Sequence, residues 1–158
     1  MFNHILLAAN DLELGKQAAR MAGDAARSFE ASDLCIVVTF PPVSDYLGTR
    51  ETEQAIAERV AKATALAEAL RQEAGRIPGK VQTSVLEGSL AQVAAVASRV
   101  RGSDLIVMNA KDLGFWGKLR AWFRIGRTLD GAPCPVLLAQ DCQRGGKVRM
   151  EPVLQSAA

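Results

Sequence analysis

The stretch VLEGSLAQVAAVASRVRGSDLIVMNA, residues 85–110, predicts the end of one strand, a helix and a second strand. Gly88 and Ser89 predict a tight turn followed by a helix start, because a serine can cap the first turn of a helix. Apolar residues then recur at helical spacing and predict the buried stripe of this helix, namely Val93, Ala97 and Val100. The run DLIVM at 104–108 predicts a buried strand. Strand, helix and strand in succession indicate parallel pairing with a right-handed crossover.

The same alternation continues on both sides of this stretch. Continuous apolar runs predict strands at residues 5–9, 34–40 and 134–139, and a more alternating run predicts an edge strand at 81–86. Helical spacing predicts helices at 12–31, 50–76 and 117–130, the last of them after a loop over 109–116. The predicted fold class is therefore α/β: an open, doubly wound, five-stranded parallel sheet. The first and fourth strands are expected to be neighbours, and the third and fifth are expected at the edges.

Length and composition limit the classes of protein to consider. The 158 residues match one ordinary domain, expected over 1–140 and followed by a polar tail at 141–158. A net charge of +2 gives no argument for nucleic acid as a partner, and no apolar run is long enough to span a membrane. The first ten residues are interpreted as a buried strand rather than a signal peptide. The three cysteines have no metal-like spacing and are expected to be reduced thiols in the cytoplasm.

Ligands of doubly wound sheets bind at the carboxyl ends of the strands, where the strand order reverses. The candidate ligand-binding residues lie at or near that edge, and they are Ala8, Asn10, Thr39, Gly88, Ser89, Met108, Asn109, Lys111, Asp112, Arg120 and Arg124. Gly88 and Ser89 have two interpretations, a turn with a helix cap or a phosphate or ribose contact at a helix start. No catalytic set is visible, because spacing places no partner beside His4, the one histidine, and no metal cluster or redox cysteine pair occurs.

Three segments in register resemble one known family. They are HILLAANDLELGKQA at 4–18, the stretch at 85–110 and GAPCPVLLA at 131–139. Together they resemble the universal stress proteins over about residues 2–140. The resemblance implies the fold of that family, also described as adenine nucleotide alpha hydrolase-like, and a small cytoplasmic homodimer that acts in stress response. It also implies one of two branches, because some members bind ATP and others do not.

The ATP-binding branch carries Gly-x2-Gly-x9-Gly-Ser after the fourth strand. Counting back from APCP at 132–135 places Asn109, Asp112, Trp122 and Phe123 at the four motif positions. Glycines let backbone N–H groups approach phosphate, and large side chains or a carboxylate at these positions oppose that contact. Asn10 stands where the family has an aspartate. Loss of three such contacts is expected to weaken ATP binding by about 10²–10³-fold.

A short segment at 115–119, FWGKL, resembles the aromatic loop of the branch that does not bind ATP. The aromatic cluster Phe115, Trp116, Trp122 and Phe123 is interpreted either as filling of a vacated nucleotide cleft or as an exposed docking patch for a protein partner. A basic stripe on the same predicted helix is either a solvated face or a site for an anionic ligand or partner, and it consists of Arg120, Arg124 and Arg127.

The expected function is binding or signalling in stress response, without standard ATP binding, without a cofactor and without enzymatic turnover. The alternative is binding of an adenine nucleotide, ATP or AMP with magnesium, through a non-standard loop in which Arg120 or Arg124 replaces backbone contacts. A related α/β nucleotide fold with another role, such as electron transfer, fits the same pattern, because fold does not determine function. A homodimer is expected through the fifth strand, because an apolar edge at 135–139 needs cover.

Overall fold

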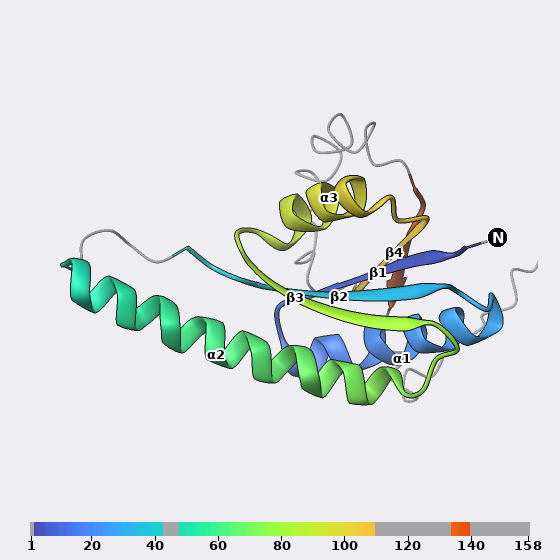
Figure 1. Ribbon diagram of the computed structural model, residues 1–158, viewed down its shortest axis with the longest axis horizontal. Coiled ribbons are helices and arrows are strands. Elements are labelled where there is room, and N and C mark those ends of the chain that lie inside the picture. The colour runs from blue at the N-terminus through green and yellow to red at the C-terminus, as the bar shows by residue number, and fades with distance from the viewer. Residues whose placement is uncertain (1, 43–47, 110–133, 140–158) are drawn as a thin grey trace, which may run out of the picture.

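The computed structural model describes residues 2–42, 48–109 and 134–139. The elements in chain order are β1 (His4–Ala9), α1 (Leu12–Ser28), β2 (Asp33–Phe40), α2 (Thr49–Ala74), β3 (Lys80–Glu87), α3 (Leu90–Arg101), β4 (Leu105–Asn109) and β5 (Val136–Ala139). All four strand pairs are parallel, and the sheet order is β3-β2-β1-β4-β5 (Figure 1). The predicted fold class, the β1–β4 neighbours and the two edge strands are confirmed.

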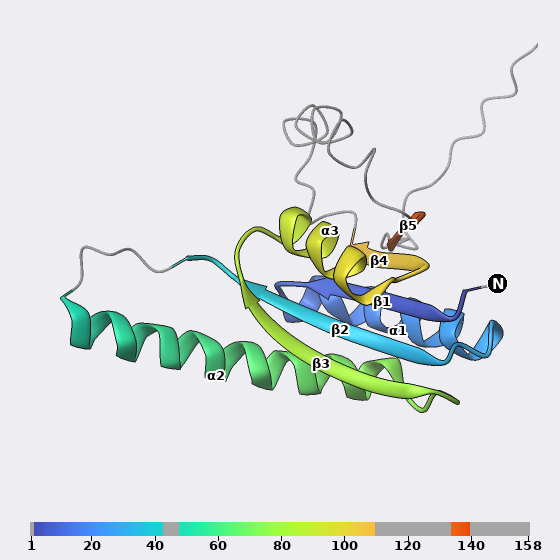
Figure 2. The ribbon, with the colours of Figure 1, turned by 45° about the horizontal axis from the view of Figure 1, so that its top comes forward.

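Two layers of helix cover the sheet. α1 and α2 lie on one face and α3 lies on the other (Figure 2). Side chains of β1 alternate between the two cores, with Ile5 and Leu7 toward α1 and α2, and Leu6 and Ala8 toward α3. All four are 1% exposed or less, which explains the continuous apolar run in the sequence. At its N-terminal end, α2 extends past the end of the sheet (Figure 1).

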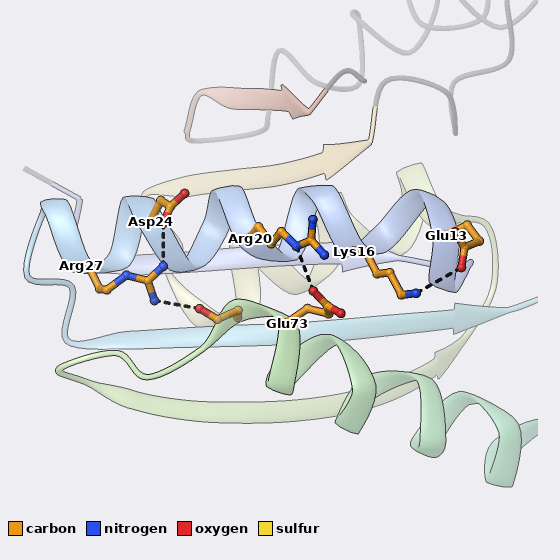
Figure 3. A network of polar contacts seen from close by, with 7 residues as sticks. Glu13, Lys16, Arg20, Asp24, Arg27 and Glu73 are labelled. Atoms are coloured by element: carbon orange, nitrogen blue, oxygen red, sulfur yellow. Dashed lines mark hydrogen bonds and ion pairs between the residues drawn. The ribbon is translucent and has the colours of Figure 1, made fainter. Parts of the chain in front are cut away.

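Glycines allow α1 and α2 to approach closely. A β-carbon on Gly15 would lie 2.9 Å from the Cδ2 of Leu70, and one on Gly23 would overlap the carbonyl oxygen of Ala74. Polar contacts reinforce this packing along the outer side of the helix pair (Figure 3). Arg20 pairs with Glu73 at 2.9 Å, and Arg27 donates to the Ala74 carbonyl at 2.8 Å and to Arg76 at 3.1 Å. The C-terminal end of α2 is therefore attached to α1.

The predicted stripe of α3 is partly wrong. Val93 and Ala97 are buried, but Val100 is 81% exposed. The position that follows Ala97 by one turn on the sheet side is Arg101, whose guanidinium reaches β3 and donates to the Gln82 side chain at 2.8 Å and the Ser84 hydroxyl at 2.7 Å. Val100 precedes Arg101 by one residue and therefore points about 100° away from it around the helix axis, which turns the valine away from the sheet.

Several predicted boundaries and one cap also differ. The first helix was predicted to residue 31 but ends at Ser28, and Glu30 then adopts a positive φ of 52°. Ser89 occupies the N-cap position of α3, yet its side chain makes no capping hydrogen bond, whereas Asp11 caps α1 by accepting from the Leu14 N–H at 3.0 Å. Asn109 belongs to β4 rather than to the following loop. The predicted helix at 117–130 and the tail lie outside the described residues.

None of the helices within the described ranges is long and apolar enough to cross a membrane.

Candidate functional site

A cavity lies at the carboxyl edge of the sheet, between the end of β2 and the side of α2. Its volume is about 270 Å³. The lining comes from β2, α2 and the residue after β1, and consists of Asn10, Val38, Thr39, Phe40, Pro41, Arg59, Lys62, Ala63 and Leu66. Because β1 and β2 are parallel and end at the same edge, Asn10 and Thr39 reach one pocket although they are far apart in the chain. Two of the predicted site residues are therefore brought together.

Thr39 is the buried polar group of this cavity. The residue is 4% exposed and makes no side-chain hydrogen bond with another described residue, but its hydroxyl is not among the fully buried side-chain atoms that lack a partner. Asn10 is exposed and follows the last residue of β1. One hydroxyl and one amide thus stand at the edge where a polar ligand group can reach them.

Two cations from α2 complete the lining, and sequence reasoning missed both. Arg59 and Lys62 lie three residues apart on one side of the helix. The Nη1 of Arg59 donates to the carbonyl of Pro41 at 2.7 Å and also reaches Pro42 at 3.4 Å, so the guanidinium fixes the start of the segment after β2. The order of the elements could have indicated them, because a helix that follows a parallel strand begins near the carboxyl end of that strand.

Asn109 ends β4, but its side chain points toward the fold rather than toward the cavity. The residue is 1% exposed, and its Nδ2 donates to the backbone oxygen of Leu14 at 2.7 Å. This contact joins the last residue of β4 to the first turn of α1. Asn109 is therefore a buried structural amide.

The remaining predicted site residues are distributed. Ala8 and Met108 are buried in the core under α3, at 0% and 3% exposure. Gly88 has a φ of 138° and donates its N–H to the Phe40 carbonyl at 3.0 Å, so it closes the turn between β3 and α3. Ser89 is exposed, and neither it nor Gly88 lines the cavity. Lys111, Asp112, Arg120 and Arg124 lie outside the described residues, as do Trp122 and Phe123.

A polar cluster that the sequence did not indicate occupies the opposite, amino edge of the sheet. The Nδ1 of His4 lies 2.7 Å from Oδ2 of Asp33, and this hydrogen bond raises the pKa of His4 above 6.5. The Oδ2 of Asp104 accepts from the N–H groups of Asn3 at 2.8 Å and His4 at 3.0 Å. The hydrogen bond with Asn3 is the main cause that lowers the pKa of Asp104 below 3.8.

The described residues contain no arrangement of three or more His, Cys, Asp or Glu side chains that could hold a metal ion. Cys35 is buried, and burial raises the pKa of its thiol. Burial also raises the pKa of Cys134, which is half-buried. Both thiols are thus disfavoured as thiolate nucleophiles.

Residues 1–140 match the family model described as the universal stress protein family. The chain belongs to this family. A curated universal stress protein from Thermus aquaticus, described by its place in the 3' region of a QAH/OAS sulfhydrylase gene, is 34% identical over 142 residues. The match covers 89% of this chain and 100% of that relative.

Solved structures of universal stress proteins have the same fold. UspA from Lactobacillus plantarum has a TM-score of 0.67 at 15% identity, and the match covers 88% of this chain and 99% of that one. A universal stress protein crystallised in complex with cAMP has a TM-score of 0.65 at 13% identity, covering 87% and 96%. These identities support the architecture alone.

Proposed function

We propose that this universal stress protein acts in stress response by reversible binding, without enzymatic turnover, and that it binds ATP weakly or not at all. The observation that carries the proposal is Asn109. It occupies the first glycine position of the ATP motif, and its amide is used to hold α1 against β4.

Side chains replace glycines at the positions where ATP phosphates would approach the backbone. A glycine at this position would let a phosphate approach the backbone, whereas the Asn109 side chain occupies the space beside the first turn of α1. The other three motif positions carry Asp112, Trp122 and Phe123 in the sequence, so no glycine remains in the motif. Asn10, in place of the family aspartate, removes a charged contact.

Isothermal titration calorimetry with magnesium and ATP tests the proposal. We expect a dissociation constant about 10²–10³-fold above that of a member with the complete motif. A dissociation constant in the low micromolar range contradicts it. ATP hydrolysis would contradict the absence of turnover. The release of phosphate would have to be proportional to the concentration of this protein, and the activity would have to remain with the protein through purification.

Binding of an adenine nucleotide, ATP or AMP with magnesium, is the second candidate function. It is supported by the cavity at the carboxyl edge, which presents the Asn10 amide and the Thr39 hydroxyl, and by a family member crystallised with cAMP. In this candidate, Arg120 or Arg124 supplies charge in place of the glycine loop, and Arg124→Ala weakens nucleotide binding. Mass spectrometry of small molecules released from the purified protein checks it.

The proposed assembly is a cytoplasmic homodimer through β5. This strand is at the edge of the sheet, and Leu137 and Leu138 are 39% and 36% exposed. Pairing with a symmetric copy would cover this apolar edge. Sedimentation velocity should give a dimer at tens of micromolar, and Leu138→Lys should shift it to monomer. A wild-type monomer under those conditions contradicts the assembly.

A further inference from the structure

We propose that the outer edge of β3 binds an extended acidic segment of a partner protein, which adds to the sheet as a further strand. This inference goes beyond reversible binding, because it names the surface and the chemistry of the partner. It concerns the edge of the sheet opposite β5, so it depends neither on ATP binding nor on the proposed dimer.

The outer edge of β3 presents backbone groups that a further strand can use. β3 is the last strand of the sheet, and β2 is its only strand partner within the described ranges (Figure 2). The N–H of Lys80 donates to the carbonyl of Ser32 at 3.0 Å, so the even-numbered residues of β3 direct their backbone groups toward β2. The backbone groups of the odd-numbered residues Val81, Thr83 and Val85 therefore point outward. Such a row is a template for strand addition.

A groove lies beside this edge, between the last turns of α2 and the start of β3. Its volume is about 610 Å³, and pockets of about 300–1,000 Å³ hold whole small ligands, so side chains fit it easily. Glu68, Arg71 and Gln72 form its α2 wall, and Val81 lines it from β3. Val81 packs toward the core under α1 and α2. Alternate side chains of a strand added beside Val81 would point to the same face and enter the groove.

The charge of the groove favours an acidic side chain. Its lining contains two arginines, Arg71 and Arg76, and one carboxylate, Glu68. An Nη1 of Arg71 lies 3.9 Å from Oε2 of Glu68, and the two side chains are 52% and 58% exposed, so this pair is weak. The Arg76 guanidinium makes no hydrogen bond or ion pair with any described residue. A carboxylate on the partner can therefore pair with Arg76 without first breaking another described contact.

The other face of an added strand would meet a different surface. Gln82 and Ser84 accept hydrogen bonds from Arg101 of α3, so the even-numbered side chains of β3 lie on the α3 face. Leu86 shares that face and is 42% exposed. The partner that fits is a strand with acidic residues on one face and apolar residues on the other.

The test uses the full chain and a synthetic peptide, acetyl-TEVEVT-amide, whose glutamates lie on one face and whose valines lie on the other. Amide hydrogen exchange is measured first. In the chain alone, the outward amides of Thr83 and Val85 should exchange faster than the inward amide of Ser84. The peptide should slow exchange at Thr83 and Val85 and change Ser84 little.

Two further peptides separate the contributions of backbone and charge in a chemical-shift titration. A peptide with glutamine in place of both glutamates should bind about 10-fold more weakly, because it keeps the backbone and loses the charge. A peptide with every backbone nitrogen methylated should not bind, because it has no N–H to donate to the outward carbonyls of β3.

Variants of the chain locate the site. Arg76→Gln should weaken the glutamate peptide by about 3–10-fold and leave the glutamine peptide unchanged. Arg50→Gln is the matched control, because it removes the same charge from an exposed arginine in the first turn of α2. Thr83→Pro removes an outward N–H, a position where an edge strand tolerates proline, and should weaken the peptide by at least about 10-fold. Thermal denaturation verifies the fold of each variant.

The inference is overturned if the amides of Thr83 and Val85 are already protected in the chain alone, since another element would then cover this edge. It is also overturned if the peptide gives no shifts at about 1 mM, or if the glutamine or the methylated peptide binds as tightly. Equal effects of Arg76→Gln and Arg50→Gln would overturn the role of the groove. None of these results bears on weak ATP binding or on the dimer through β5, which calorimetry and sedimentation test separately.

Discussion

Gly23 of α1 lies against the carbonyl oxygen of Ala74, the last residue of α2, with no space for a β-carbon between them. The same carbonyl accepts a hydrogen bond from Arg27 at 2.8 Å (Figure 3). Two residues of α1 thus contact the carbonyl oxygen of Ala74. Gly23 packs against it because it has no side chain, and Arg27 donates a hydrogen bond to it. The two contacts can be tested separately.

Gly23→Ala should destabilise the protein. Alanine gains up to about 1 kcal/mol over glycine inside a helix, but the added methyl forces the helices apart at a cost of about 1–3 kcal/mol, so a net loss is expected. Denaturant unfolding measures it. Gly48→Ser is the control, because a β-carbon at Gly48 meets nothing within 4 Å and serine is favoured at a helix N-cap. A more stable Gly23→Ala variant would show that the helices can separate freely.

Arg27→Met should cost about 1–2 kcal/mol. The methionine keeps most of the apolar stem, so the loss reports the hydrogen bonds to the carbonyls of Ala74 and Arg76 at the C-terminal end of α2, together with a small contribution from the exposed ion pair with Asp24. Arg20→Met on the same helix removes the ion pair with Glu73 and should cost at most about 1 kcal/mol, since exposed pairs contribute little. Equal losses in the two variants would contradict a special role for the carbonyl contacts.

Asn109→Ala should destabilise by about 1–3 kcal/mol, because it removes a buried hydrogen bond between β4 and α1 and leaves a small void. Asn10→Ala, at an exposed position on the same edge, should change stability by no more than about 0.5 kcal/mol. Chemical denaturation measures the free energy of unfolding of both variants. A clearly larger loss in Asn109→Ala shows that the Asn109 amide stabilises the fold. If both variants are as stable as the wild type, Asn109 has no structural role, and this part of the explanation for weak ATP binding is wrong.

The His4–Asp33 pair should make stability depend on pH. Since Asp33 raises the pKa of His4, the stabilisation is fully present below the unfolded value of 6.5 and is lost as pH rises through the folded value. The melting temperature should therefore fall from about pH 5.5 to about pH 8.5 by more in the wild type than in His4→Gln. Asp104 does not contribute in this window, because its lowered pKa lies below 3.8. Identical pH profiles would refute the coupling.

The fold could be predicted because its signals are local. The continuous apolar run of β2 and the alternating pattern of β3 each report which faces are covered, so a central strand and an edge strand were correctly distinguished. The position of Asn10 and Thr39 at one edge follows from parallel pairing alone. Both therefore appeared among the predicted site residues.

The contacts that were missed depend on register or on the rotation of a helix. His4 meets Asp33 because the two residues are partners in the β1–β2 ladder, a relation that spacing along the chain does not give. Val100 was assigned to the buried stripe of α3, but the helix presents Arg101 to the sheet in the last turn. Lys62 was missed because an exposed lysine on a long helix carries no signal until the neighbouring strand end is placed.

Because α2 extends beyond the sheet, its two ends should differ in the free energy needed to unfold them locally. Its 26 residues span ~39 Å, whereas the eight residues of β2 span ~26 Å. The described buried residues of α2 begin only at Ala63. Amide hydrogens in the first turns should therefore exchange with solvent through local fraying, and those near Leu70 only through global unfolding.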